Sequence, residues 1–180
     1  MDPTDDQLMA RFCAGDESAF NALYERHAPA VSAFLCRMVG RPDVAEDLMQ
    51  TTFTSLVRSR GRYQMGANLR SWVFTIAANA ARDSMRRDRI RTSPSVAWNL
   101  AKDTEAPVLR DPAAAKAIEA ALGELPPGGR EAVLLHKVND LAFSEVGAIL
   151  GISAAAARVR AHRAYQRLRV RLAFLREENP

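Results

Sequence analysis

Apolar residues recur every three or four positions along most of the chain, which is the spacing of amphipathic α-helices. Near the C-terminus, Val146, Ile149 and Leu150 predict a short helix. Gly151 follows it and tolerates the left-handed backbone of a helix end, while Ser153 is placed to cap a second helix. The chain shows no strand-like alternation and no internal repeat, so the sequence predicts an all-α protein.

The helix predicted after Ser153 has two different faces. Small and apolar residues form the expected inward face, namely Ala157, Ala161, Ala164, Leu168 and Leu172. The other positions hold six arginines and no acidic residue between them, namely Arg158, Arg160, Arg163, Arg167, Arg169 and Arg171. Close packing combined with a cationic surface is typical of a helix-turn-helix recognition helix, which enters the major groove of DNA. A solvated basic helix is the alternative, although so many arginines would repel one another without an anionic partner.

Five more helices are predicted in the N-terminal half, where glycines and prolines interrupt the apolar pattern. Their expected ranges are 4–13, 16–27, 28–39, 43–60 and 68–90, with Pro29 opening the third and Asp43 capping the fourth. In the last of them, Leu69, Val73, Ile76 and Ala80 form the expected core stripe.

The helix predicted over 68–90 carries a second face of different chemistry. Trp72, Asn79 and Arg86 are spaced by seven residues and lie together, with Arg82 beside them. An aromatic ring, an amide and cations are the groups that contact unstacked bases and phosphates. We therefore expect this face to bind nucleic acid, with packing of Trp72 between helices as the alternative.

The helical periodicity fails over residues 92–111, which contain Pro94 and Pro107. A structureless loop of this length is uncommon inside one compact domain. The sequence therefore predicts two small helical domains, at 1–91 and 112–180, joined by a flexible linker. The second domain is expected to begin with helices over 111–122 and 130–139, the latter packing through Val133, Leu134 and Val138.

Charge and cysteine usage narrow the class of protein. The net charge is +4, and residues 113–180 carry ten basic and seven acidic side chains against twelve and eleven in residues 1–90. The excess near the C-terminal end is expected if that end meets nucleic acid. Cys13 and Cys36 lie in apolar helical patterns and are interpreted as buried thiols in a reducing compartment. Without a signal-peptide core or a long apolar run, a cytoplasmic protein with no direct membrane insertion is expected.

The residue patterns that support catalysis are absent from the sequence. It contains no glycine-rich phosphate loop and no metal-binding spacing of cysteine or histidine. His27, His136 and His162 are far apart, and the adjacent Glu46 and Asp47 point in different directions on a helix. We predict a protein that is not an enzyme, without metal, cofactor or small-molecule substrate.

Three separated motifs, in this order, resemble an extracytoplasmic-function (group IV) sigma factor of bacterial RNA polymerase. They are DVAEDLMQTTFTSL at 43–56, NLRSWVFTIAANAARDSMRR at 68–87, and the helix-turn-helix segment at 122–169 that contains LGIS and RAHRA. The second motif is similar to the family's promoter-melting helix, in which an aromatic start precedes I-A-x-N, matched by Ile76, Ala77 and Asn79. The resemblance covers about 6–172.

The resemblance implies a role for each motif. Asp47, Gln50 and Phe53 would dock the clamp of the largest polymerase subunit, with packing of Phe53 in the core as the alternative. The −10 promoter element would be contacted by Tyr63, Trp72, Asn79, Arg82, Arg86 and Arg87. The −35 element would be contacted by Arg158, Val159, Arg160, His162, Arg163 and Arg167. The implied partners are core RNA polymerase, including its flap, promoter DNA and an anti-sigma factor.

The implied function is recognition of both promoter elements and help in opening the promoter for transcription initiation. Ala155, Ala156 and Val159 stand where the family usually has glycine, threonine and serine at the start of the recognition helix. Two hydroxyl groups are lost, so the promoter sequence read by relatives does not transfer. Two other functions remain open from sequence. One is a helix-turn-helix transcriptional regulator acting without core polymerase, and the other is a helical adaptor that binds an acidic protein.

Overall fold

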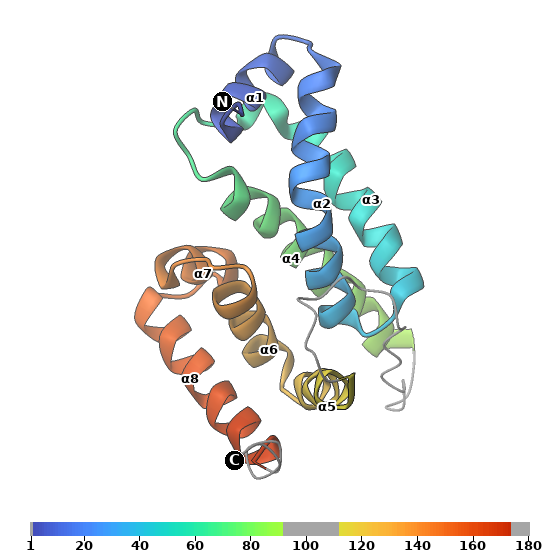
Figure 1. The fold of residues 1–180 in the computed structure, drawn as a ribbon, viewed down its shortest axis with the longest axis vertical. Coiled ribbons are helices and arrows are strands. Elements are labelled where there is room, and N and C mark those ends of the chain that lie inside the picture. Colours follow the sequence, from blue (N-terminus) through green and yellow to red (C-terminus); the bar gives the residue numbers. More distant parts are fainter. Residues whose placement is uncertain (1, 92–111, 174–180) are drawn as a thin grey trace.

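The computed structural model describes residues 2–91 and 112–173. Within these ranges the chain forms eight α-helices and no strand (Figure 1). The helices are α1 Asp5–Cys13, α2 Glu17–Val39, α3 Pro42–Ser59, α4 Leu69–Arg91, α5 Pro112–Gly123, α6 Pro127–Val133, α7 Phe143–Leu150 and α8 Ala154–Arg171. A 3₁₀ turn, η1 Arg60–Arg62, follows α3, and a π-helical segment, η2 Leu134–Val138, follows α6. The predicted all-α fold is confirmed, and the predicted linker at 92–111 lies outside the described residues.

Helices α1 to α4 pack around a core in the N-terminal half. The Thr4 hydroxyl accepts from the Gln7 N–H, and the Gln7 side chain accepts from the Thr4 N–H, so a capping box begins α1. Helix α2 packs against α1, α3 and α4. The rings of Phe34 in α2 and Phe74 in α4 meet edge to face at 5.3 Å and are both fully buried. Helix α4 is thereby fixed in the core along one side.

Helix α2 is one continuous helix, and the prediction of two helices separated at Pro29 was wrong. A proline inside a helix removes one backbone hydrogen bond and crowds the preceding turn, at a cost of about 3 kcal/mol. The apolar stripe nevertheless continues across it, since Leu23, Val31 and Phe34 are all 0 % exposed. Packing of this stripe against the neighbouring helices outweighs the local cost of the proline.

Three local predictions in the same half also require correction. Arg41, not Asp43, is the residue that precedes α3, because Pro42 occupies the first helical position and suits it. Cys13 is exposed because it ends α1, whereas Cys36 is buried as predicted. Ile76 is only partly buried, because the core side of α4 is filled by other residues, namely Phe74, Ala77, Ala78 and Ala81.

Helices α7 and α8 form the predicted helix-turn-helix. Gly151 ends α7 with a φ of 65°, and the Ser153 hydroxyl accepts from the Ala156 N–H at the start of α8. A Cβ at Gly147 would lie 2.8 Å from the Ile152 carbonyl oxygen, so the turn packs directly on α7. The small residues Ala157, Ala161 and Ala164 are buried, as predicted for the inward face of α8.

The helix predicted over 130–139 differs from expectation. It begins at Pro127 and changes to the π-helical segment η2 after Val133. A π-helical turn contains more residues than an α-helical turn and therefore shifts the register of the side chains that follow. Val138 is 39 % exposed as a result, whereas Val133 and Leu134 are buried as predicted.

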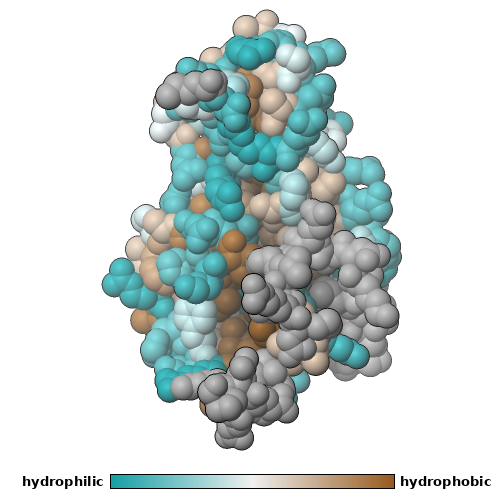
Figure 2. All heavy atoms as spheres, viewed as in Figure 1, coloured by the Kyte–Doolittle hydropathy of each residue, from teal (hydrophilic) through white to brown (hydrophobic). Residues whose placement is uncertain are grey.

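The two halves of the chain contact each other. Helix α4 packs against α7, and α2 packs against α5, α6 and η2. The side chain of Arg130 in α6 is 6 % exposed, and its Nη1 donates to the Met38 carbonyl oxygen of α2 at 2.8 Å. Polar residues cover most of the N-terminal half in Figure 2, while a strip of hydrophobic residues is visible lower down, in the part of the view that holds α5, α6 and α8.

Candidate nucleic-acid and polymerase interface

The six arginines of α8 are all exposed on the outer surface of the helix-turn-helix. Arg158 lies over the ring of Phe143, with its guanidinium carbon 5.5 Å from the ring centre. Arg171 pairs with Glu124. Val159 is 50 % exposed between these cations, and His162 is exposed on the same helix. The structure therefore brings all six predicted −35 residues to the surface of one helix.

A groove runs between the start of α6 and the arginine-bearing face of α8. Its lining includes Gly128, Gly129, Val159, Arg160 and Arg163. The glycines let the helices approach closely, because a Cβ at Gly128 would lie 3.1 Å from Arg160 Nη1 and a Cβ at Gly129 3.3 Å from the Ala164 Cβ. Arg160 is thereby held at the edge of the groove beside the exposed Arg163.

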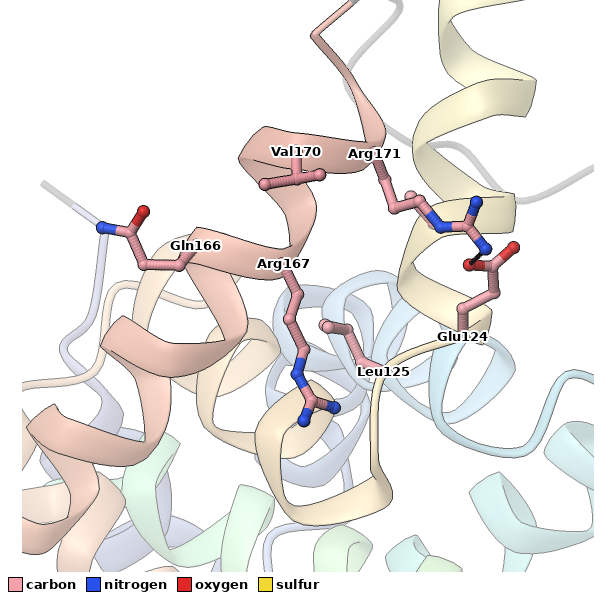
Figure 3. A pocket seen from close by; sticks show the side chains of 7 residues that line it. Glu124, Leu125, Gln166, Arg167, Val170 and Arg171 are labelled. Carbon is pink, nitrogen blue, oxygen red and sulfur yellow. Dashed lines mark ion pairs between the residues drawn. The ribbon is translucent and has the colours of Figure 1, made fainter.

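A second groove lies between the end of α5 and the end of α8 (Figure 3). Leu125 and Val170 supply its apolar lining, and the ion pair of Arg171 with Glu124 crosses one side of it. Arg167 lines both grooves. Val170 is 76 % exposed, so this end of α8 presents an apolar surface among cations.

The predicted −10 residues near the start of α4 form an aromatic pair. The rings of Tyr63, in the loop after η1, and Trp72, in α4, lie 5.3 Å apart between centres at an angle of 38°. The Tyr63 hydroxyl lies 2.7 Å from Asp6 Oδ1 and 2.6 Å from the Ala67 carbonyl oxygen. Burial and the neighbouring Asp6 carboxylate raise the pKa of Tyr63, so this hydroxyl remains a donor. Trp72 is partly buried and packs against the core, as the packing alternative predicted, and its contact with DNA stays a prediction.

Asn79 and the arginines of α4 lie further along the same helix. Asn79 is exposed, and its Oδ1 accepts from Arg82 Nη2 at 2.6 Å. Arg82 Nη2 also donates to the Ile149 carbonyl oxygen of α7 at 2.9 Å. Arg86 and Arg87 are exposed, and Arg86 pairs with Asp83 at 3.0 Å. The side chains of Arg86 and Arg87 therefore reach solvent, whereas Arg82 faces the C-terminal half.

The residues predicted to dock polymerase lie on α3 and separate into two groups. Asp47 and Gln50 are exposed. Phe53 is 4 % exposed and its ring packs on Tyr24, with the ring centres 4.6 Å apart. A residue this deeply buried contributes to the core, so only Asp47 and Gln50 of the three polymerase candidates are exposed.

Sequence reasoning did not single out Arg130 and Glu131, two adjacent buried charges of α6. Arg130 donates to carbonyl oxygens of Leu122, Gly123 and Leu125 as well as to Met38, and burial lowers its pKa to about 10. Glu131 is 3 % exposed, and burial raises its pKa to about 7, against the opposing effect of Arg82 and Arg160. The sequence signal that could have identified these two buried charges is an arginine followed directly by a glutamate within an otherwise apolar helical pattern.

The three histidines do not converge on one site. His27 Nε2 lies 2.9 Å from Asp5 Oδ2, and burial lowers its pKa although the carboxylate acts in the opposite direction. His136 Nδ1 lies 2.9 Å from the Leu141 carbonyl oxygen, and its ring stacks on Phe143. Over residues 2–91 and 112–173, no cluster of metal-ligating side chains occurs. In the same residues no helix is long and apolar enough to cross a bilayer.

Comparison with known proteins identifies the class to which this geometry belongs. Residues 23–90 match the Sigma-70 region 2 family, and residues 115–168 match the Sigma-70 region 4 family. The first match covers α4 and its −10 candidates, and the second covers the helix-turn-helix. The chain thus combines two helical modules of transcription initiation factors.

Individual relatives of the chain are members of the same class of protein. The chain is 47 % identical to the RNA polymerase sigma factor CarQ of Myxococcus xanthus, over 94 % of this chain and 98 % of the relative. It is 31 % identical to the ECF RNA polymerase sigma factor SigF of Caulobacter vibrioides, over 92 % of both chains. The chain belongs to the ECF sigma factors of bacterial RNA polymerase.

Solved structures show the same fold. The sigma factor RpoE of Bartonella quintana, solved with the anti-sigma factor NepR, superposes with a TM-score of 0.71 at 28 % identity, over 86 % of this chain and 96 % of that one. The sigma factor CnrH, solved with the cytosolic domain of CnrY, has a TM-score of 0.68 at 22 % identity, over 98 % and 99 % of the two chains. The sequence-based identification as a sigma factor that recognises promoters with RNA polymerase is therefore confirmed.

Proposed function

We propose that two exposed surfaces of this chain, one on α8 and one on α4, read the two elements of one promoter. The observation that carries the proposal is that α8 presents six exposed arginines while α4 presents Asn79, Arg86 and Arg87. Residues 1–91 would bind core polymerase and the −10 element, and residues 112–180 would bind the −35 element. Residues 92–111 would link these two domains. The linker then increases the effective concentration of each domain at its own site.

The −35 element would be bound by α8 in the major groove. Arg158, Arg160, Arg163 and Arg167 supply positive charge to phosphates and bidentate donors to guanine. Val159 and His162 lie among them and reach base edges. The absence of hydroxyl groups at Ala156 and Val159 shifts recognition toward the arginines.

The −10 element would be captured as a single strand on α4. Tyr63 and Trp72 offer a pair of aromatic rings in contact, and Asn79 offers an amide for the edge of an unstacked base. Arg82, Arg86 and Arg87 would meet the phosphates. Capture of unpaired bases stabilises the open promoter without any chemical step, so the chain has no catalytic activity of its own.

The polymerase clamp would be bound by α3 through Asp47 and Gln50, with Phe53 supporting that helix from the core. The flap would be bound by the C-terminal domain. The solved relative RpoE was crystallised with the anti-sigma factor NepR, which supports an anti-sigma factor as a further partner of this chain. A cytoplasmic location accords with polymerase and promoter DNA as partners.

The experiment that tests this function is run-off transcription with purified core polymerase, the chain and a library of genomic fragments, sequenced at the start sites. Starts that share two spaced upstream motifs are expected. Tight binding to duplex DNA without polymerase, together with no starts, would instead indicate an independent regulator.

A further inference from the structure

Val159 is an apolar side chain in the middle of the cationic surface of α8. It is 50 % exposed, although the residues that line the same groove include Arg160, Arg163 and Arg167. A single exposed apolar side chain is common on a protein surface and needs no explanation by itself. What distinguishes Val159 is its position, because the side chains before and after it are proposed contacts to the −35 element.

Val159 lies on the side of α8 that points away from the rest of the domain. The inward side consists of small buried residues, namely Ala157, Ala161 and Ala164. Residues three and four positions apart share one side of a helix. Val159 thereby shares the outward side with other exposed residues, namely Ala155, His162 and Gln166. It comes five residues after Ala154, where α8 begins, and the N-terminal residues of a recognition helix are those that contact base edges.

The two arginines next to Val159 in sequence point toward different helices and leave it uncovered. The guanidinium carbon of Arg158 lies 5.5 Å from the ring centre of Phe143 in α7. Arg160 Nη1 lies next to Gly128 of α6, where a Cβ would be only 3.1 Å away. Each cation is therefore held beside another helix of the domain. The branched apolar side chain between them is the group that α8 would present to the floor of a DNA groove.

The chemistry of Val159 restricts what it can contact in DNA. Its side chain has neither a donor nor an acceptor, so it cannot bond to the polar groups that bases expose in the major groove. Thymine alone of the four bases also places a methyl group there, at C5. An apolar side chain that excludes water from this methyl group gains the free energy of burying apolar surface. One that excludes water from a polar edge, without replacing the lost hydrogen bond, is disfavoured.

We propose that Val159 is a specificity-determining residue, which contacts the C5 methyl group of a thymine in the −35 element. The inference rests on the proposed function, since it assumes that α8 enters the major groove of that element. The surrounding arginines supply affinity for phosphates and read guanine. Val159 selects an A·T pair and, because the methyl group belongs to thymine, determines on which strand that thymine lies.

Removal of a single methyl group from the DNA tests this inference. Holoenzyme is assembled from core polymerase and the full chain, and its binding is measured by competition on a promoter fragment from the mapped start sites. In the competitors, each thymine of the −35 element is replaced in turn by deoxyuridine, which lacks only the C5 methyl group. At one position the replacement is expected to weaken binding about fourfold, the factor that corresponds to burying one methyl group.

The variant Val159→Ala should bind the thymine and the deoxyuridine fragment equally at that position. The side chain is exposed, so its truncation opens no cavity, and the thermal unfolding temperature should stay the same. Arg163→Ala is the matched control, because Arg163 lines the same groove. This variant should bind both fragments more weakly and keep the difference between them.

The outcomes separate this inference from the proposed function. Equal binding of all deoxyuridine fragments by the unmodified chain, or a difference that persists in Val159→Ala, would overturn the thymine contact and leave the sigma function intact. A −35 motif without an A·T pair would do the same. Failure of the holoenzyme to start transcription at specific sites would overturn the proposed function, and this inference with it.

Discussion

The ring of Tyr63 packs against that of Trp72 in a tilted arrangement, with 5.3 Å between ring centres, and ties the loop after η1 to the start of α4. The Tyr63 hydroxyl at the same time contacts Asp6 of α1. One side chain therefore links three elements around the proposed −10 surface. This contact positions the two rings before any DNA is bound, which would reduce the conformational entropy lost if they capture the −10 strand as proposed.

Separate functions are expected for the ring and the hydroxyl of Tyr63. Tyr63→Phe keeps the ring contact with Trp72 and loses the contact with Asp6, so the free energy of unfolding should fall by about 0.5–1.5 kcal/mol while start-site selection is retained. Tyr63→Ala should impair promoter opening as well. Urea unfolding and permanganate footprinting of the open promoter measure the two effects. Equal loss of opening in both variants would show that the hydroxyl itself contacts DNA.

Loss of the Asn79 amide should affect opening and not assembly. Asn79→Ala removes the acceptor for an unstacked base but leaves α3 unchanged, so binding to core polymerase should equal that of the unmodified chain. Permanganate reactivity at the −10 element should fall. Native gel shifts with labelled core polymerase provide the control. Lost polymerase binding would contradict the role assigned to this face of α4.

Substitutions of the α8 arginines are expected to weaken −35 binding to different extents, according to the partner of each arginine. Arg163→Ala should weaken binding to a −35 duplex by roughly 1–3 kcal/mol and relax specificity at one base pair, if the guanidinium reads guanine. Arg171→Ala is the matched control, because this arginine is engaged by Glu124 at the end of the helix. Fluorescence anisotropy on a set of single-base variants measures both. A uniform loss over all sequences would assign Arg163 to phosphate.

Close packing in the helix-turn-helix makes Gly147 sensitive to substitution. A Cβ there would lie 2.8 Å from the Ile152 carbonyl oxygen and 3.0 Å from the Ala154 nitrogen, so Gly147→Ala must displace the turn. Thermal stability and −35 binding are both expected to fall. Gly61→Ala serves as the control, since a Cβ at Gly61 meets nothing within 4 Å. Unaltered −35 binding by Gly147→Ala would show that the turn adjusts without moving α8.

The buried Glu131 should make stability depend on pH near neutrality. Its pKa is raised from 4.5 to about 7, chiefly by burial, so the folded chain binds more protons than the unfolded chain between these values. Stability contributed by the neutral carboxyl is therefore present below pH 4.5 and is lost as pH rises through about 7. Glu131→Gln should remove this dependence and stabilise the chain at pH 8, by roughly 1–3 kcal/mol. Urea unfolding at pH 5 and pH 8 measures the free energy of unfolding of both proteins. An equal change in this free energy between the two pH values, in Glu131→Gln and in the unmodified chain, would contradict the prediction.

Local sequence patterns were sufficient to predict several helix ends, the exposed face of α8 and the family of this protein. Thr4, Asn68, Gly151 and Ser153 were predicted at helix ends, and each occupies such a position because capping depends on groups within a few residues. The arginine face of α8 follows from spacing alone, since Ala157 and Ala161 determine which side packs inward. The family followed from three motifs and was confirmed by comparison.

Long-range packing determined the features that local sequence patterns did not predict. Pro29 lies inside α2 because buried residues on both sides of it share one face, and Val138 is exposed because η2 shifts the helical register. Neither result follows from propensity, which describes a residue and its near neighbours. The contacts of Arg82 with Ile149 and Glu131 join residues 67 and 49 positions apart, so they exist only once two domains have docked. Residue spacing along the chain was enough to place the candidate promoter-reading side chains on α4 and α8, whereas the tertiary structure determined which of these candidates contact the other half of the chain.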